Sequence, residues 1–279
     1  NPEISNKKLM ALVTGCRAGT ENLMKLCTRV GTNNFYSTCQ ELLERTERAM
    51  RILIEHNLSE EPQSFEDYVD DDGMGNGPLK LKLTAWREGE TAYFDWTGTA
   101  LQTPGPVNFF LNEGLFKGFV GNYLIGRVDP EMLLNDGYHH LINVTMPKGS
   151  ILNPNFPAAL GHNAPVITRH FDVLNGVMSN NNIEMTSGAS YGSVPMFHYW
   201  GARKNGHEFQ LTEILCGGLP GCSLSDGLDG HLWLPGINAV PTERLEIYFP
   251  LIVEKYFCMP DSGGGGKHRG GNGIEKIYV

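Results

Sequence analysis

The first part of the chain has the hydrophobic spacing of helices. Apolar residues between positions 6 and 28 recur at three- and four-residue intervals, with interruptions at Gly15 and Gly19. The pattern is more regular over residues 36–56, where charged side chains occupy the opposite face. We expect two helices packed as an antiparallel pair. Residues 1–62 would then form a helical segment that continues an N-terminal region missing from this chain.

A mixed pattern follows the helical segment. Leu79, Leu81 and Leu83 alternate with lysines, which predicts a half-buried strand, and residues 92–96 are its expected hairpin partner. Further along, the spacing predicts one more strand over 141–146 and two buried helices over 107–125 and 166–178. We therefore expect residues 63–185 to form an α+β region.

The last third of the chain alternates strand patterns with glycines. Strands are predicted over residues 196–200, 208–215 and 244–257. Residues 263–273 are rich in glycine, and an apolar pattern resumes at Ile274, so a loop between two strands is favoured over a flexible tail. Residues 186–279 are thus expected to be a glycine-rich β region. The predicted fold class is α+β, with a helical pair, mixed β-sheets and two buried helices.

Composition and charge narrow the class of protein. The formal net charge is −9, and the chain lacks the clustered Lys and Arg that neutralise phosphates, which argues against a nucleic-acid partner. No apolar run reaches the roughly 18 residues of a membrane span. The six cysteines include no Cys-x-x-Cys pair, which is typical of reduced thiols in a cytoplasmic protein.

Motifs of the common enzyme classes are missing. Neither Gly-x-Ser-x-Gly nor a phosphate-binding glycine loop with Lys-Ser/Thr occurs, so a serine hydrolase is not supported and a nucleotide would bind elsewhere. No histidine or aspartate has a recognised metal-ligand spacing, and we assign no metal ligand. The segment 226–231 contains two Asp-Gly steps before His231, which is a candidate acid or base. A pair of ordinary β-turns is the alternative.

Ten short motifs occur along the chain in the order found in one protein family, and together they are specific although each is weak alone. They are Asp70-Asp71-Asp72-Gly73, Phe94-Asp95-Trp96-Thr97-Gly98, Gly105-Pro106-Val107-Asn108, Leu134-Asn135-Asp136-Gly137, Pro147-Lys148-Gly149-Ser150-Ile151-Leu152-Asn153-Pro154, Thr168-Arg169, Cys216-Gly217-Gly218, Asp229-Gly230-His231, Leu245-Glu246-Ile247-Tyr248-Phe249-Pro250-Leu251, and Asp261-Ser262-Gly263-Gly264 with Arg269-Gly270-Gly271-Asn272-Gly273. With these motifs the whole chain resembles the hydantoinase B family.

The resemblance implies a role in a larger complex. The family includes B subunits of ATP-dependent N-methylhydantoinases, the C-terminal half of 5-oxoprolinase, and subunits of caprolactamase and of acetone and acetophenone carboxylases. It implies a hydantoinase A-like partner that binds ATP and Mg²⁺, and activation of the substrate by phosphorylation. What matches is the middle and C-terminal portion of the family. A Mn²⁺ or Zn²⁺ site, where present, is expected on an N-terminal segment absent from this chain.

Residue chemistry and the resemblance together select candidate site residues, in three groups. Polar groups expected to act in catalysis are Arg169, Asp229 and His231. Residues expected to bind substrate are Asp72, Asn108, Asp136, Gly217 and Gly218. Residues expected to shape a loop at the site or at the partner interface are Gly263, Gly264, Arg269, Gly270 and Gly271.

The predicted function is that of a B-type subunit, or a fragment of one, in an ATP-dependent hetero-oligomer that opens a hydantoin, oxoproline or lactam ring. Arg169 suits bidentate binding of a carboxylate or phosphate. One alternative is a subunit of an ATP-dependent ketone carboxylase. A second, of another class, is a non-catalytic scaffold whose glycine loop docks the ATP-binding subunit.

Overall fold

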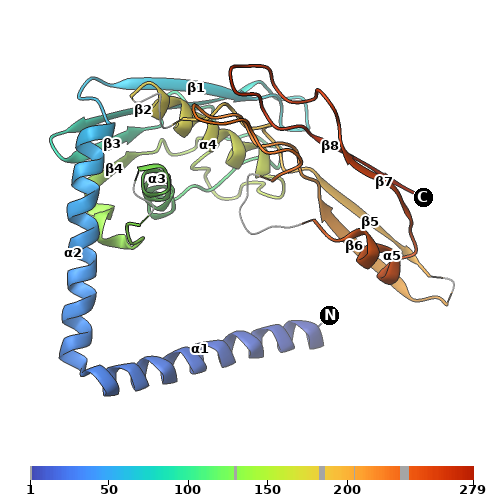
Figure 1. Ribbon diagram of the computed structural model, residues 1–279, viewed down its shortest axis with the longest axis horizontal. Helices are drawn as coiled ribbons and strands as arrows, with labels where there is room; N and C mark the ends of the chain where they lie inside the picture. The colour runs from blue at the N-terminus through green and yellow to red at the C-terminus, as the bar shows by residue number, and fades with distance from the viewer. Residues whose placement is uncertain (1, 129–130, 182–185, 204, 233–238) are drawn as a thin grey trace.

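Two long helices, α1 (Pro2–Val30) and α2 (Thr32–Asn57), open the chain in the computed structural model, which describes residues 2–128, 131–181, 186–203, 205–232 and 239–279. The helical pair is present, but its antiparallel packing was wrong. Figure 1 shows α1 leaving α2 at a sharp bend. The bend lies at Gly31, whose φ of 84° redirects the chain. α1 is continuous through Gly15 and Gly19, where the apolar spacing is interrupted.

The central sheet has four strands in the order β1-β2-β3-β4: β1 (Gln63–Val69), β2 (Leu79–Glu88), β3 (Thr91–Asp95) and β4 (Ile142–Thr145). The predicted hairpin of β2 and β3 is confirmed, with Ala85 opposite Phe94. β4 adds parallel to β3. The sequence did not predict β1, because most of its residues are exposed and its apolar positions do not alternate.

Two helices complete the layer over the sheet: α3 (Glu113–Val128) and α4 (Ala164–Ser179). α4 confirms the predicted helix. α3 begins six residues later than predicted, because Phe109 and Leu111 instead bond through their backbone to Ile151 and Leu152. The Asn112 side chain then accepts from the Leu115 N–H and starts the helix.

A short 3-10 helix, η1 (Asp136–Leu141), precedes β4 and packs against α2. The turn predicted before it is present, because the Asn135 side chain accepts from the Gly137 N–H at 2.9 Å. The Asn135 amide also donates to Thr46 of α2 at 2.7 Å.

The C-terminal third consists of two hairpins (Figure 1), β5 (Met196–Ala202) with β6 (Glu208–Ile214) and β7 (Val253–Cys258) with β8 (Ile274–Tyr278). The glycine-rich loop connects β7 to β8 as predicted. The strand expected over 244–257 was wrong in its first half, which forms the helix α5 (Thr242–Tyr248). Pro241 directly precedes α5, and Pro250 lies two residues after its end, so a proline flanks the helix on each side.

Buried apolar side chains concentrate in the first two thirds of the described chain. The main hydrophobic cluster runs from Met50 to Met178 and includes the edge-to-face rings of Phe94, Trp96 and Phe116. The hairpins contribute few fully buried apolar residues. Helices combined with several small sheets confirm the α+β class.

Candidate functional site

A pocket of about 590 Å³ lies in the C-terminal third, where three segments distant in sequence meet. The segments are residues 188–191, 215–221 and 262–276. Nine of the 21 lining residues are glycines, namely Gly188, Gly217, Gly218, Gly221, Gly264, Gly265, Gly270, Gly271 and Gly273. We call it the glycine-walled pocket.

Glycine is required in this wall because backbones touch one another directly. A Cβ at Gly218 would overlap the carbonyl oxygen of Gly271, and a Cβ at Gly271 would overlap that of Leu228. Gly227 has the same relation to Leu219. Backbone hydrogen bonds hold the approach, with Gly271 N–H donating to Leu219 at 2.8 Å. The glycines therefore serve close packing of chain segments, as well as lining a cavity.

Asp229 ties the turn at 226–231 to the glycine-rich loop. Its Oδ1 accepts from Arg269 Nη1 at 2.8 Å and from the Asn272 N–H at 2.7 Å. Both interactions lower the pKa of Asp229, the Arg269 bond more than the backbone bond. The predicted site residues Asp229 and Arg269 thus hold the glycine-rich loop against the turn at 226–231.

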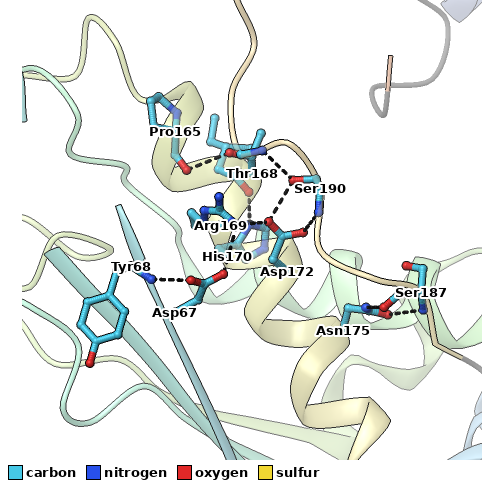
Figure 2. Close-up of polar contacts among 12 residues, drawn as sticks. Asp67, Tyr68, Pro165, Thr168, Arg169, His170, Asp172, Asn175, Ser187 and Ser190 are labelled. Carbon is cyan, nitrogen blue, oxygen red and sulfur yellow. Dashed lines mark hydrogen bonds and ion pairs between the residues drawn. The ribbon is translucent and has the colours of Figure 1, made fainter. Parts of the chain in front are cut away.

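A second polar cluster joins α4 to Ser190 (Figure 2), which lines the pocket. Arg169 Nη1 contacts Asp67 at 3.1 Å and Asp172 at 3.0 Å. Asp172 in turn accepts from both the N–H and the hydroxyl of Ser190, at 2.8 and 2.9 Å. Burial raises the pKa of Asp172, and the Ser190 donors and Arg169 oppose that rise. Since Ser190 lines the pocket, Arg169 supports the wall through Asp172.

One turn further along α4, Asn175 pins the same wall segment. Figure 2 shows its amide beside Ser187. The Asn175 Nδ2 donates to the Ser187 carbonyl at 2.5 Å, and Tyr123 donates its hydroxyl to Asn175 Oδ1 at 2.8 Å. The hydrophobic core and the glycine-walled pocket are therefore connected through polar side chains of one helix.

A buried ion pair lies beside the pocket on the two hairpins. Lys276 of β8 and Glu213 of β6 are 3% and 4% exposed, and their charged atoms are 2.7 Å apart. Tyr278 and Tyr199 donate their hydroxyls to Glu213 at 2.6 and 3.2 Å. Two charges this deeply buried need such partners. Lys276 is also one of the residues that line the pocket.

The predicted substrate residues Asp72 and Asn108 lie in the core region instead. Asp72 accepts from the Thr103 hydroxyl and the Gly105 N–H. The hydrogen bond from Thr103, followed by those from Asn76 and Met74, holds the pKa of Asp72 far below its usual range. Asn108, fully buried, donates to the carbonyls of Thr103 and Gly105. Together they shape the loop around Gly105.

Two further predicted site residues, Asp136 and His231, are exposed. Asp136 has 88% of its side chain exposed, on η1, and His231 is exposed after the turn at Gly230. Neither lines the glycine-walled pocket. The Asp229, His231 and Arg169 side chains do not line the pocket, and Arg169 and Asp229 have different partners.

Five predicted residues do meet in the pocket wall, namely Gly217, Gly218, Gly264, Gly270 and Gly271. Gly263 lies next to them, where its N–H donates to Asn272 Oδ1 at 3.1 Å. Sequence reasoning missed Tyr191, Glu213 and Lys276. The pattern around Lys276 is that of an exposed strand residue, and no local signal distinguishes it.

The described ranges contain no cluster of three or more His, Cys, Asp or Glu side chains suited to hold a metal ion. None of the described helices combines the length and hydropathy needed to cross a membrane.

Comparison with known proteins places the whole chain in one family. Residues 1–279 match the family model described as hydantoinase B/oxoprolinase. A 5-oxoprolinase of Dictyostelium discoideum is 26% identical over 279 residues, covering 95% of this chain and 20% of that protein. Caprolactamase subunit beta of Pseudomonas jessenii is 25% identical over 284 residues, covering 95% of this chain and 46% of that protein.

A solved structure has the same fold. The crystal structure of ATP-dependent caprolactamase from Pseudomonas jessenii superposes with a TM-score of 0.82 at 21% identity, over 95% of this chain and 47% of that chain. The present chain therefore spans between a fifth and about half of the length of these relatives. Because the family model covers residues 1–279, the resemblance carried by the short motifs is confirmed, and the chain belongs to the hydantoinase B/oxoprolinase family.

Proposed function

We propose that this chain is a B-type subunit, or part of one, of an ATP-dependent cytoplasmic complex that hydrolyses a cyclic amide such as a hydantoin, 5-oxoproline or a lactam. The observation that supports it most strongly is the family match over residues 1–279. Relatives named 5-oxoprolinase and caprolactamase subunit beta favour ring opening of a cyclic amide.

The proposal assigns ATP and Mg²⁺ to an A-type partner subunit, where they would supply activation of the amide oxygen. This chain contributes the surface that holds the ring. The glycine-walled pocket is the candidate, because its 590 Å³ admits a small ring and its wall offers backbone donors.

The roles proposed for the polar residues follow their contacts. Arg169 is engaged by two carboxylates and Asp229 by Arg269 and Asn272, so both act as positioning residues for the pocket wall. His231 is exposed at the end of the turn that Asp229 holds, and we propose it as the group that transfers a proton at the interface with the partner.

Reconstitution with the A-type partner tests this function. The complex should hydrolyse ATP when 5-oxoproline, hydantoin or caprolactam is added, and the chain alone should not turn over any of them. His231→Ala should lower ring opening by roughly 10²-fold or more, the usual size of general acid–base catalysis. Glu254→Ala, on the exposed face of β7, is the matched control and should leave the rate unchanged.

The same assay separates the rival functions. ATP hydrolysis that requires a ketone and bicarbonate, with no response to cyclic amides, would replace ring opening by carboxylation. A scaffold role would be indicated if His231→Ala and Arg169→Ala left the rate unchanged while deletion of residues 263–271 abolished assembly.

A further inference from the structure

The Tyr191 hydroxyl of the glycine-walled pocket is free to form a hydrogen bond with a ligand. Tyr191 lines the pocket, and its hydroxyl oxygen is buried without a hydrogen-bond partner of normal geometry among the described residues. Burial raises the pKa of Tyr191, so its hydroxyl keeps its proton at neutral pH. A protonated hydroxyl can donate to an acceptor, and buried hydroxyls ordinarily have a partner. An acceptor on a bound ligand would supply that partner.

Backbone donors surround the same space. Gly217, Gly218, Gly264 and Gly265 line the pocket, and none of their N–H groups is bonded to another residue in the described ranges. Gly217 and Gly218 are only partly exposed, and buried N–H groups are ordinarily paired. Backbone N–H groups gathered on a concave surface are a common way to bind an anion.

The charges around the pocket favour an anion as well. No Asp or Glu is among the residues that line it, although the chain has a net charge of −9. Lys276 and His268 line it instead. The Lys276 ammonium bonds Glu213 and lies 4.8 Å from the ring centre of Tyr256, while Glu213 also receives two tyrosine hydroxyls. His268 likewise lies 3.5 Å from Asp226. Each basic side chain thus has a carboxylate partner, but neither Glu213 nor Asp226 lines the pocket.

We propose that the glycine-walled pocket binds a ligand oxyanion, a carboxylate or a phosphoryl group, to which the Tyr191 hydroxyl and the N–H groups of Gly217 and Gly218 donate. The preference for an anion follows from the pocket alone. Its identification as the carboxylate of a ring such as 5-oxoproline, or as the phosphoryl group on an activated amide, rests on the proposed function.

Calorimetric titration of the full 279-residue chain, without ATP or partner, tests the proposal. The ligands are 5-oxoproline, 2-pyrrolidinone, which is the same ring without the carboxylate, and inorganic phosphate. At least one anion should bind at least about tenfold more tightly than 2-pyrrolidinone, as expected for a charged hydrogen bond. Tighter binding of phosphate identifies a phosphoryl site, and tighter binding of 5-oxoproline identifies a carboxylate site. Equal binding of the two rings without phosphate binding, or no binding of either anion, overturns the proposal.

Two variants separate binding from folding. Tyr191→Phe should weaken anion binding about tenfold at an unchanged melting temperature, because the hydroxyl it removes bonds no described residue. Gly265→Leu should block binding, since a Cβ at Gly265 meets open space and the longer side chain would enter the pocket. Tyr68→Phe, whose hydroxyl bonds Glu66 on the exposed face of β1, is the control and should bind normally. Unchanged anion affinity in Tyr191→Phe contradicts the proposal.

The outcomes distinguish this site from the proposed function. If anion binding depends on Tyr191 but the reconstituted complex does not respond to cyclic amides, the proposed function is contradicted and the oxyanion site is supported. If the chain binds no anion and Tyr191→Phe does not change the rate of ring opening, the oxyanion site is contradicted and the proposed function is supported.

Discussion

Residues 50–178 and residues 186–279 hold their shape by different means. The first region encloses an apolar cluster in which aromatic rings such as Phe116 are fully buried. In the second region, backbones pack against backbones at glycines, and a buried Lys276–Glu213 pair joins the two hairpins. Polar side chains of α4 connect the two regions.

The difference explains where a site can form. A packed apolar core leaves no room for a polar ligand. Glycine backbones approach closely yet keep their N–H groups at the surface of a cavity, so the second region combines rigidity with unoccupied hydrogen-bond donors. The stability of the second region therefore depends on a few polar contacts.

The largest expected effect is in the core. Phe116→Ala removes a fully buried ring that packs against Phe94 and Trp96, and should lower the free energy of unfolding by roughly 3–5 kcal/mol. Urea denaturation followed by circular dichroism measures it. Phe156→Ala, at a ring that is 98% exposed, is the control and should change stability by no more than about 0.5 kcal/mol. Equal effects of the two changes would remove the contrast between core and surface.

A similar or slightly smaller effect is expected from the buried ion pair. Lys276→Met leaves the Glu213 carboxylate unpaired in the interior and should cost about 3–5 kcal/mol. Hydrogen exchange should accelerate in the β5–β6 and β7–β8 hairpins while α3 and α4 stay protected. Adding Glu213→Gln should recover part of the loss. Uniform loss of protection through the helices would mean that both regions unfold as one unit, contrary to the comparison.

The buried histidine of the core makes stability depend on pH. Burial among aromatic rings lowers the pKa of His170 to about 4, from 6.5. Because the unfolded chain takes up this proton near pH 6.5, the stability due to neutral His170 is complete above that pH and is lost as the pH falls toward 4. Between pH 7.5 and 5 the loss should be roughly 2 kcal/mol.

Denaturation at both pH values measures this dependence. His170→Phe should remove it, whereas His162→Phe, at an exposed position, should keep it. An unchanged pH dependence in the His170 variant would place its origin elsewhere.

The smallest effect distinguishes glycines that pack from glycines that only line the cavity. Gly218→Ala forces a methyl group onto the Gly271 carbonyl and should cost about 1–3 kcal/mol. Gly264→Ala meets no atom within 4 Å and should stay within about 0.5 kcal/mol. Thermal unfolding of the two variants compares them. Matching losses would show that the backbone approach at Gly218 does not stabilise the region.

Much of the fold could be predicted because its signals are local. The alternating leucines of β2 and the three- and four-residue spacing in α2 and α4 each report a buried face. Two errors arose where no periodic signal is present. β1 has no periodic signal because it is mostly exposed, and α5 was assigned to a strand because its seven residues are too few for a helical period.

The candidate site was predicted only in part. Glycines such as Gly217 and Gly271 stand out in sequence, and the pocket does lie between their segments. Tyr191, Glu213 and Lys276 could not be found from sequence. Glu213, for example, is buried by contacts with residues up to 65 positions away, and the local sequence of all three is that of ordinary strand and loop residues. Arg169 was expected to meet a substrate, but the tertiary fold places two carboxylates against it first.

By itself, the sequence determined the α+β class, the family and the position of the glycine-rich loop between two strands. These depend on spacing and residue order along the chain. Only the tertiary structure decided which donors remain unpaired and which charges are buried together. Hydrogen-bond satisfaction and desolvation depend on what surrounds a group in space. The local sequence around residues such as Tyr191 and Gly217 does not reveal those surroundings.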